Sequence, residues 1–165
     1  MPANALVTGG SGLLGLNILL HEPPLYKFRA VSHKRQLCLP NVQLTEMDLG
    51  SLQSIEEGLK INAPKVVIHT AGMTNVDGCN GDPNAANFIN GILPANLAKV
   101  CRDLGIKFVH ISTDHLFDGT ESFVSEEASP KPLNAYGYSK ALGEEGVLQN
   151  NKEALIVRCN FFTWG

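Results

Sequence analysis

A glycine-rich loop near the start of the chain, TGGSGLLG at positions 8–15, most constrains the fold. It follows a short apolar run at 5–7 and opens an apolar stretch, Leu13 to Leu20, with the character of a buried helix. A strand, a glycine turn and a helix in this order typically bind the pyrophosphate of a dinucleotide, because glycine admits phosphate to the main chain and the helix N-terminus offers free amides. The candidate contacts are Gly9, Gly12, Leu13, Leu14 and Gly15.

The spacing of these glycines leaves a purely structural alternative open. They lie three residues apart, as GxxGxxG, whereas the most familiar dinucleotide fingerprint is GxGxxG. A glycine trio can also serve a tight turn and close helix packing without any ligand. The position of the loop directly after a predicted strand favours the ligand-binding interpretation.

Short apolar runs alternate with helical patterns along the chain, which indicates βαβ units and a parallel sheet. The predicted strands are 5–7, 28–31, 42–44, 66–69, 108–111 and 154–157. The predicted helices are 12–20, 52–59, 85–104 and 135–149. Pro94 falls inside the third helix and should either start a new helix or kink this one. We predict an α/β fold, a Rossmann-type doubly wound parallel sheet with helices on both faces.

Composition excludes several classes of function. The 165 residues fit one domain, 1–165, and the net charge of -3 gives no reason to expect nucleic acid or an anionic membrane as partner. The four cysteines lie far apart without a CxxC pair, so we predict neither a metal site nor a disulfide framework. Reduced thiols and the lack of a long apolar stretch favour a cytoplasmic protein.

The sequence YGYSK at 136–140 is the second candidate feature. Residues four apart share a helix face, so Tyr136 and Lys140 can point into one site, whereas Tyr138 is followed four residues later by Leu142. A nearby ammonium lowers the pKa of a phenol and makes it a usable proton donor near neutral pH. The alternative is a surface tyrosine beside a solvated lysine.

The third feature, ISTDHLFDG at 111–119, follows the predicted strand 108–111. Ligands of open α/β sheets bind at the carboxyl ends of strands. There the hydroxyl of Ser112 or Thr113 can bond a substrate carbonyl oxygen. Asp114 would contact substrate or, as an alternative, cap the loop.

The residues after the second predicted strand bear on cofactor choice. NAD-dependent proteins place a carboxylate there for the ribose 2′-hydroxyl, but this chain has Ser32, His33, Lys34 and Arg35. A basic, hydroxyl-bearing loop suits a 2′-phosphate, so NADP(H) is favoured over NAD(H). A solvated basic loop without a ligand is the alternative.

Together these features resemble the extended short-chain dehydrogenase/reductase superfamily, which carries TGxxGxxG, a hydroxyl residue and YxxxK. Within it the chain looks most like the dTDP-4-dehydrorhamnose reductase family, through TNVDGC at 74–79, NFIN at 87–90 and ISTDHLFDG at 111–119. The last motif is similar to that family's ISTDYVFDG, with His115 in place of tyrosine. The resemblance runs from Leu6 to about Arg158.

The resemblance implies a role for each matching residue. The loop glycines would pack against the cofactor pyrophosphate, Asp48 with Leu49 would contact the adenine, and Thr70, Ala71 and Gly72 would line the ribose and nicotinamide. The implied reaction is reduction of the C4 ketone of a nucleotide-linked 6-deoxyhexose, with hydride from the cofactor.

For the chemistry itself, the resemblance implies three residues. Thr113 would bind the substrate keto oxygen and Tyr136 would donate the proton. Lys140 would hold the nicotinamide ribose and lower the pKa of the tyrosine. His69 and His110, in predicted strands, are expected to be packed and hydrogen-bonded, and Cys79 to be exposed without an activated thiolate.

Two alternatives to a reductase remain within the resemblance. One is a non-catalytic NADP-binding subunit similar to the regulatory beta subunit of methionine adenosyltransferase, and the other is a nucleotide-sugar epimerase or dehydratase. Residues 158–165 look like the end of a sixth strand and the loop leaving it. We therefore expect a C-terminal substrate-binding lobe to be absent, so that this chain binds NADPH without turnover. Apolar surface exposed by that absence would favour association, such as a homodimer.

Overall fold

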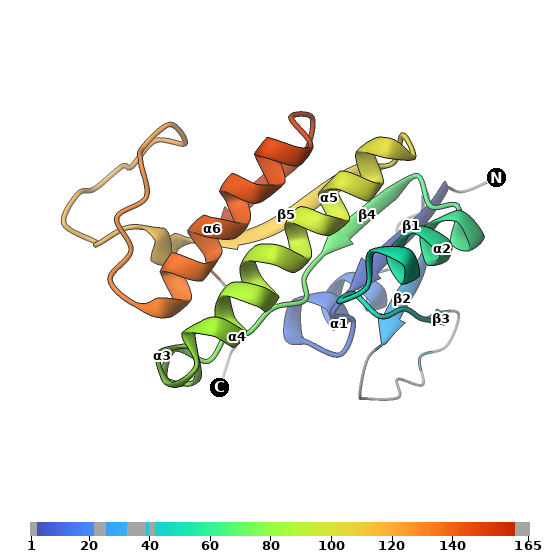
Figure 1. Ribbon diagram of the computed structural model, residues 1–165, viewed down its shortest axis with the longest axis horizontal. Helices are drawn as coiled ribbons and strands as arrows, with labels where there is room; N and C mark the ends of the chain where they lie inside the picture. The colour runs from blue at the N-terminus through green and yellow to red at the C-terminus, as the bar shows by residue number, and fades with distance from the viewer. Residues whose placement is uncertain (1–2, 22–25, 33–38, 40–41, 161–165) are drawn as a thin grey trace.

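Six parallel strands form one sheet in the computed structural model, which describes residues 3–21, 26–32, 39 and 42–160 (Figure 1). The strands are β1 (Ala3–Thr8), β2 (Tyr26–Ser32), β3 (Gln43–Glu46), β4 (Val66–His69), β5 (Lys107–Thr113) and β6 (Leu155–Cys159). Their order is β3-β2-β1-β4-β5-β6, and each neighbouring pair is parallel. The chain runs outward from β1 to β3, returns to β4 and then runs outward the other way. This reversal between β1 and β4 confirms the predicted Rossmann-type fold.

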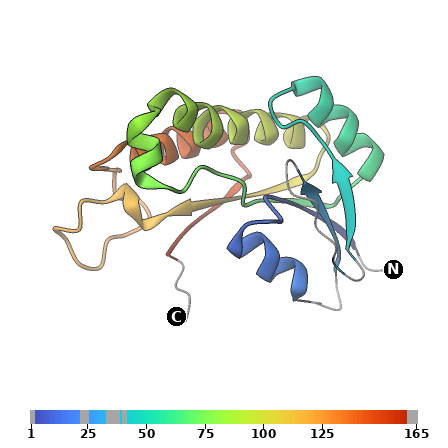
Figure 2. The ribbon, with the colours of Figure 1, turned by 90° about the horizontal axis from the view of Figure 1, so that it is seen from below.

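Helices cover both faces of the sheet (Figure 2). Helix α1 (Leu13–Leu20) lies on one face, and α2 (Leu52–Asn62), α5 (Leu93–Asp103) and α6 (Ala135–Asn150) lie on the other. The doubly wound arrangement is therefore confirmed. Within the described ranges, the structure contains no helix long and apolar enough to cross a membrane.

Alternation along β1 explains why one strand supplies two cores. Successive side chains of a strand point to opposite faces. Leu6 joins the larger cluster with residues of α2 and α5, such as Ile55 and Leu97. Val7, next in sequence, joins a small cluster with Leu19 of α1 and its neighbours. The face covered by three helices holds most of the buried apolar side chains.

The third predicted helix is divided into three pieces. It consists of α4 (Pro83–Asn87), a π-helical turn η1 (Phe88–Ile92) and α5, and it follows a short helix α3 (Val76–Gly81) that the sequence did not predict. The Leu93 N–H donates to the Phe88 carbonyl, the i→i+5 bond of the π turn. Pro94 lies in the first turn of α5, where a missing N–H is no loss. The backbone stays helical from α4 through the π turn into α5, so Pro94 begins a segment of a continuous helical run and not a separate helix.

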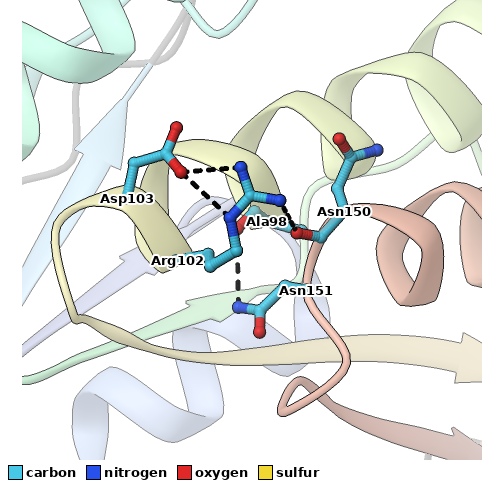
Figure 3. Close-up of polar contacts among 5 residues, drawn as sticks. All are labelled: Ala98, Arg102, Asp103, Asn150 and Asn151. Carbon is cyan, nitrogen blue, oxygen red and sulfur yellow. Dashed lines mark hydrogen bonds and ion pairs between the residues drawn. The ribbon is translucent and has the colours of Figure 1, made fainter.

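The C-terminal ends of α5 and α6 are joined by a polar cluster (Figure 3). Arg102 donates from Nη1 to the Asn150 carbonyl at 2.5 Å and from Nη2 to the Asp103 carboxylate at 2.6 Å. Asn151 donates from Nδ2 to the Ala98 carbonyl at 3.4 Å. These bonds hold the end of α6 that lies remote from Tyr136 and Lys140.

Candidate active site

A cleft of about 420 Å³ opens at the carboxyl ends of the strands, beside the reversal of strand order. Open α/β sheets bind their ligands at this place. Most of the predicted site residues line it, namely Gly12, Leu13, Leu14, Gly15, Thr70, Ala71, Gly72, Ser112, Thr113, Tyr136 and Lys140. The fold therefore brings together residues that are up to 128 positions apart in the sequence.

One wall of the cleft, which we call the glycine wall, is made by the glycine loop and the segment after β4. Gly9 has φ +71°, and a Cβ there would lie 2.6 Å from the Ala71 backbone nitrogen. A Cβ on Gly15 would lie 2.4 Å from the Gly9 carbonyl oxygen. Neither position can hold another residue without displacing backbone.

Gly12 plays a different part in the glycine wall. It is the N-cap of α1, and no side chain caps that helix. A Cβ on Gly12 would meet only the Gly9 carbonyl oxygen, at 3.3 Å, and would otherwise project into the cleft. The uncapped amides of the α1 N-terminus and the room above Gly12 fit a dinucleotide pyrophosphate.

The opposite wall, the side-chain wall, is made by β5 and α6. The Asn134 side chain caps α6 by accepting from the Gly137 N–H at 2.9 Å, which fixes the first turn that carries Tyr136. Lys140, one turn later, donates from Nζ to the Ile111 carbonyl at 2.6 Å. The Thr113 hydroxyl accepts from the His115 N–H at 3.2 Å. A hydroxyl, a phenol and an ammonium thus meet at one end of the cleft.

Burial governs the ionisation of the two catalytic candidates on α6. It lowers the pKa of Lys140 to about 8, which the Glu144 carboxylate partly opposes. Burial raises the pKa of Tyr136, and hydrogen bonding by the Thr113 side chain partly offsets this. The expected lowering of the Tyr136 pKa by Lys140 was wrong for this structure, in which burial dominates and the ammonium is bonded to the Ile111 carbonyl. The phenol is protonated at neutral pH, as a proton donor must be.

The residues predicted for the adenosine end lie apart from the cleft lining. The Asp48 carboxylate accepts from the Gly50 N–H at 2.9 Å, and Leu49 packs against the larger core. Ser32 ends β2, but its side chain and residues 33–35 lie outside the described residues. The adenine and 2′-phosphate contacts therefore stay predictions.

The two substrate candidates on β5 and after it have different surroundings. The Asp114 carboxylate accepts from Asn160 Nδ2 at 2.8 Å and contacts the Thr113 hydroxyl at 3.3 Å. This bonding accords with the loop-capping alternative. Ser112 is only 3% exposed, and its hydroxyl has no partner among the described residues.

Asn90 belongs to the cleft lining, and although it ends the NFIN motif at 87–90, no role was predicted for it. Its amide accepts from the Met73 N–H at 2.8 Å and donates to the Met73 carbonyl and the Ser139 hydroxyl, both at 2.9 Å. Asn90 therefore joins the segment after β4 to α6. The available signal was Pro94, four residues later, because a proline cannot donate to the Asn90 carbonyl and so favours a widened turn.

A second missed contact joins α6 to β6. Arg158 donates from Nη2 to the Glu144 carboxylate at 2.7 Å, and its guanidinium lies 5.4 Å from the centre of the Phe117 ring. These residues line an adjacent hollow of about 1000 Å³ between β6, α6 and the loop after β5. The larger hollow contains neither Tyr136 nor Lys140, so the smaller cleft is the candidate active site.

Of the expectations for three isolated residues, one holds and two need correction. His69 is packed and hydrogen-bonded as expected, with Nδ1 2.7 Å from the Thr8 hydroxyl. His110 is packed, but neither ring nitrogen has a partner among the described residues. Cys79 is buried rather than exposed, and burial raises its pKa. Cys79 lies on the buried face of helix α3, which the sequence did not reveal.

The fold and the threonine, tyrosine and lysine in its cleft define a protein of the extended short-chain dehydrogenase/reductase class. The RmlD substrate binding domain family matches residues 3–163, and the chain belongs to this family, that of dTDP-4-dehydrorhamnose reductase. The likeness predicted from the motifs is thereby confirmed.

Similar proteins include both reductases and a subunit of another enzyme. The chain is 37% identical over 158 residues to the probable low-salt glycan biosynthesis reductase Agl14 of Haloferax volcanii, covering 95% of this chain and 53% of that protein. It is 33% identical over 155 residues to methionine adenosyltransferase 2 subunit beta of Xenopus laevis, covering 93% and 45%. The chain thus spans about half the length of these curated relatives.

A solved structure shares the fold closely. The dTDP-4-dehydrorhamnose reductase of Bacillus anthracis, in complex with NADP, superposes with a TM-score of 0.81 at 28% identity. The match covers 96% of this chain and 53% of that chain.

Proposed function

We propose that residues 1–165 form the NADP(H)-binding part of a reductase that acts on the C4 ketone of a nucleotide-linked 6-deoxyhexose. The observation that carries the proposal is the meeting of Thr113, Tyr136 and Lys140 at one end of a cleft whose other wall is the glycine loop. The reductases among the similar proteins support it.

Each residue of the side-chain wall has a role in this proposal. The bound cofactor supplies the hydride that reduces the ketone. The Thr113 hydroxyl donates a hydrogen bond to the keto oxygen and stabilises the charge that develops on it. Tyr136, protonated because burial raises its pKa, gives its proton to that oxygen. Lys140 binds the nicotinamide ribose and places the phenol within reach.

The preference for NADP(H) over NAD(H) is part of the proposal. It rests on the basic run that follows β2 and lacks a carboxylate. The similar reductase of Bacillus anthracis, whose structure contains NADP, supports the same choice. A 2′-phosphate is the feature that distinguishes the two cofactors and the one that lysine and arginine side chains bind.

A regulatory, non-catalytic subunit is the second candidate. Its support is the 33% identity to methionine adenosyltransferase 2 subunit beta. A subunit that only binds the cofactor has no need for Thr113, Tyr136 and Lys140 together, so the intact set favours the reductase. An epimerase or dehydratase shares the cofactor half, and only product analysis separates it from a reductase.

Cofactor titration of the chain, by binding heat or nicotinamide fluorescence, is the first test. We expect NADPH to bind more tightly than NADH, and Gly12→Val to raise the NADPH Kd at least about tenfold, since the new side chain enters the pyrophosphate position. Gly81→Val is the matched control, because a Cβ there meets nothing within 4 Å. Tighter NADH binding would overturn the preference, and equal effects of the two variants would overturn the site.

Turnover is tested in a chain joined to a second lobe of the relatives' length, with dTDP-4-dehydrorhamnose as substrate. We expect Tyr136→Phe to lower kcat by about 100- to 10,000-fold while NADPH binding is kept. Binding of NADPH without reduction in the unsubstituted protein would favour the regulatory candidate. A homodimer and a cytoplasmic location stay predictions, of which sedimentation tests the first.

A further inference from the structure

Three side chains beneath the side-chain wall carry buried polar atoms without protein partners. The atoms are His69 Nε2, His110 Nδ1, His110 Nε2 and Ser112 Oγ, and none has a hydrogen-bond partner among the described residues. The side chains are 1%, 1% and 3% exposed. A buried polar atom left unpaired costs about 1–3 kcal/mol, so proteins rarely leave several together.

The three residues form one group, which we call the buried polar cluster. The parallel register of β4 and β5 sets His69 opposite His110. Their rings stack with centroids 5.6 Å apart and planes inclined by 19°. Ser112 lies two residues after His110, and side chains two apart on a strand share a face. These four atoms therefore belong to one place in the fold, whereas a fifth unpaired buried atom of the described residues, Arg29 Nε, lies on β2.

The cluster lies directly beneath Lys140. The Ile111 carbonyl that accepts from Lys140 Nζ belongs to the residue between His110 and Ser112. One helical turn after Lys140, a Cβ on Gly143 would lie 3.5 Å from His110 Nε2, so α6 rests on this imidazole. Burial and then the Lys140 charge lower the pKa of both histidines, so both rings are neutral at neutral pH.

We propose that the buried polar cluster holds at least one internal water molecule that links His110 and Ser112 to the Lys140 ammonium, which makes both of them positioning residues for Lys140. An ammonium has three N–H donors, and one of them is bonded to the Ile111 carbonyl. A neutral imidazole and a hydroxyl each offer an acceptor. An internal water needs two to four polar partners, and the cluster with Lys140 supplies them.

The other end of the cluster reaches the glycine wall. His69 Nδ1 lies 2.7 Å from the Thr8 hydroxyl, and the Thr8 carbonyl accepts from the Thr70 hydroxyl at 2.6 Å. Thr8 directly precedes Gly9. A hydrogen bond and one ring stack thus join the loop predicted to bind pyrophosphate to His110, and the proposed water extends this connection to the lysine predicted to bind ribose.

The inference rests on the proposed function only for the role of Lys140, and it has a test that needs no cofactor. Acceptors beside an ammonium favour its charged form, whereas burial opposes it. The pH dependence of Lys140 acetylation by a trace of acetic anhydride, read by mass spectrometry, reports this balance directly. We expect a midpoint near 8 in the unsubstituted chain.

Three variants and one control make the test decisive. His110→Phe and Ser112→Ala should lower the midpoint by about one pH unit, and His110→Gln, which keeps polar atoms, should restore part of the shift. Val109→Ala, whose side chain points to the opposite face of β5, should leave the midpoint unchanged. Ser112→Ala is the smallest change, and its acetylation midpoint tests the proposal if His110→Phe does not fold.

Counting long-lived internal waters by ¹⁷O relaxation dispersion is the second measurement. We expect at least one fewer such water in Ser112→Ala or His110→Phe than in the Val109→Ala control. Unchanged midpoints in the folded variants, or an unchanged water count, would overturn the inference. Loss of the proposed function would appear instead as a failure to bind NADPH, which neither measurement requires.

Discussion

The two walls of the cleft are built on opposite principles. The glycine wall presents backbone, and its tightest positions, Gly9 and Gly15, exclude any side chain. The side-chain wall presents a hydroxyl, a phenol and an ammonium, two of them on a single helix. Beneath the first lies a small apolar cluster, and beneath the second lies the buried polar cluster.

The two walls are therefore damaged by opposite kinds of substitution. Added atoms damage the glycine wall, because its backbone contacts leave no space for them. Removed or newly charged atoms damage the side-chain wall, because its groups depend on buried polar partners. The predictions below test this contrast.

The largest expected effect is a loss of stability in acid, through the two buried histidines beneath the side-chain wall. His69 has a pKa of about 3 in the folded protein and that of His110 is also well lowered, against an ordinary value of 6.5. Above pH 6.5 neither form of the chain is protonated at these rings, but below it only the unfolded form takes up protons. We expect the free energy of unfolding to fall by about 3 kcal/mol between pH 6.5 and 5 for the pair, since each unfolded imidazole is already half protonated at pH 6.5.

Urea unfolding at several pH values measures this loss. His110→Phe removes one of the two groups and should reduce the pH slope by about half, whatever its effect at neutral pH. A slope that this variant leaves unchanged would show that other groups cause the acid sensitivity.

Adding a single methyl group to the glycine wall should lower the free energy of unfolding by an amount similar to the acid effect. Gly9→Ala combines a positive φ with a clash against Ala71, and we expect a loss of about 3 kcal/mol in unfolding free energy. Gly119→Ala has a similar φ of +77° but meets nothing within 4 Å, so it should cost only about 1 kcal/mol. Equal losses in urea unfolding would mean that backbone strain alone, and not the close approach, constrains the loop.

Breaking the ion pair that joins α6 to β6 should have a smaller effect. Glu144→Gln leaves the partly buried Arg158 without its charged partner, and we expect a loss of about 2 kcal/mol. Glu145→Gln, next to it and exposed, is the matched control and should change stability by less than about 0.5 kcal/mol. Thermal unfolding compares the two variants, and indistinguishable midpoints would contradict the structural role of the pair.

The smallest effect is expected far from both walls. Arg102→Ala removes the exposed bonds to Asp103 and the Asn150 carbonyl, and we expect a loss of about 0.5 kcal/mol. NADPH affinity should not change, because the cluster joins only the far ends of α5 and α6. A change in affinity would show that the position of Tyr136 and Lys140 depends on the whole length of α6.

The sequence predicted the sheet well because local patterns specify its strands. The run at 66–69 coincides with β4, and α6 differs from its predicted range by one residue at its end. Helix α3 escaped prediction since it has six residues, two of them glycine. The π turn at Phe88–Ile92 also escaped, because its bonds depend on how Asn90 and α6 pack.

The site was predictable in its residues but not in its electrostatics. Motif spacing was enough to select Tyr136 and Lys140, which both line the cleft. It could not show that burial outweighs the lysine in setting the pKa of Tyr136, nor that Asn90 holds the wall together. Burial depends on side chains from β4, β5 and α6 meeting, and no local pattern records that.

Local interactions determined some features of this protein, and long-range packing determined others. The sequence alone determined the alternation of strands and helices, the glycine loop and the reactive side chains, because apolar period, glycine geometry and helical spacing act over a few residues. Only the tertiary structure decided that polar atoms of His69, His110 and Ser112 without a partner among the described residues lie beneath Lys140, and that burial sets the protonation of the site. These features arise where segments distant in the sequence pack together and exclude water. The free-energy cost of removing a polar or charged side chain from water therefore depends on the assembled fold.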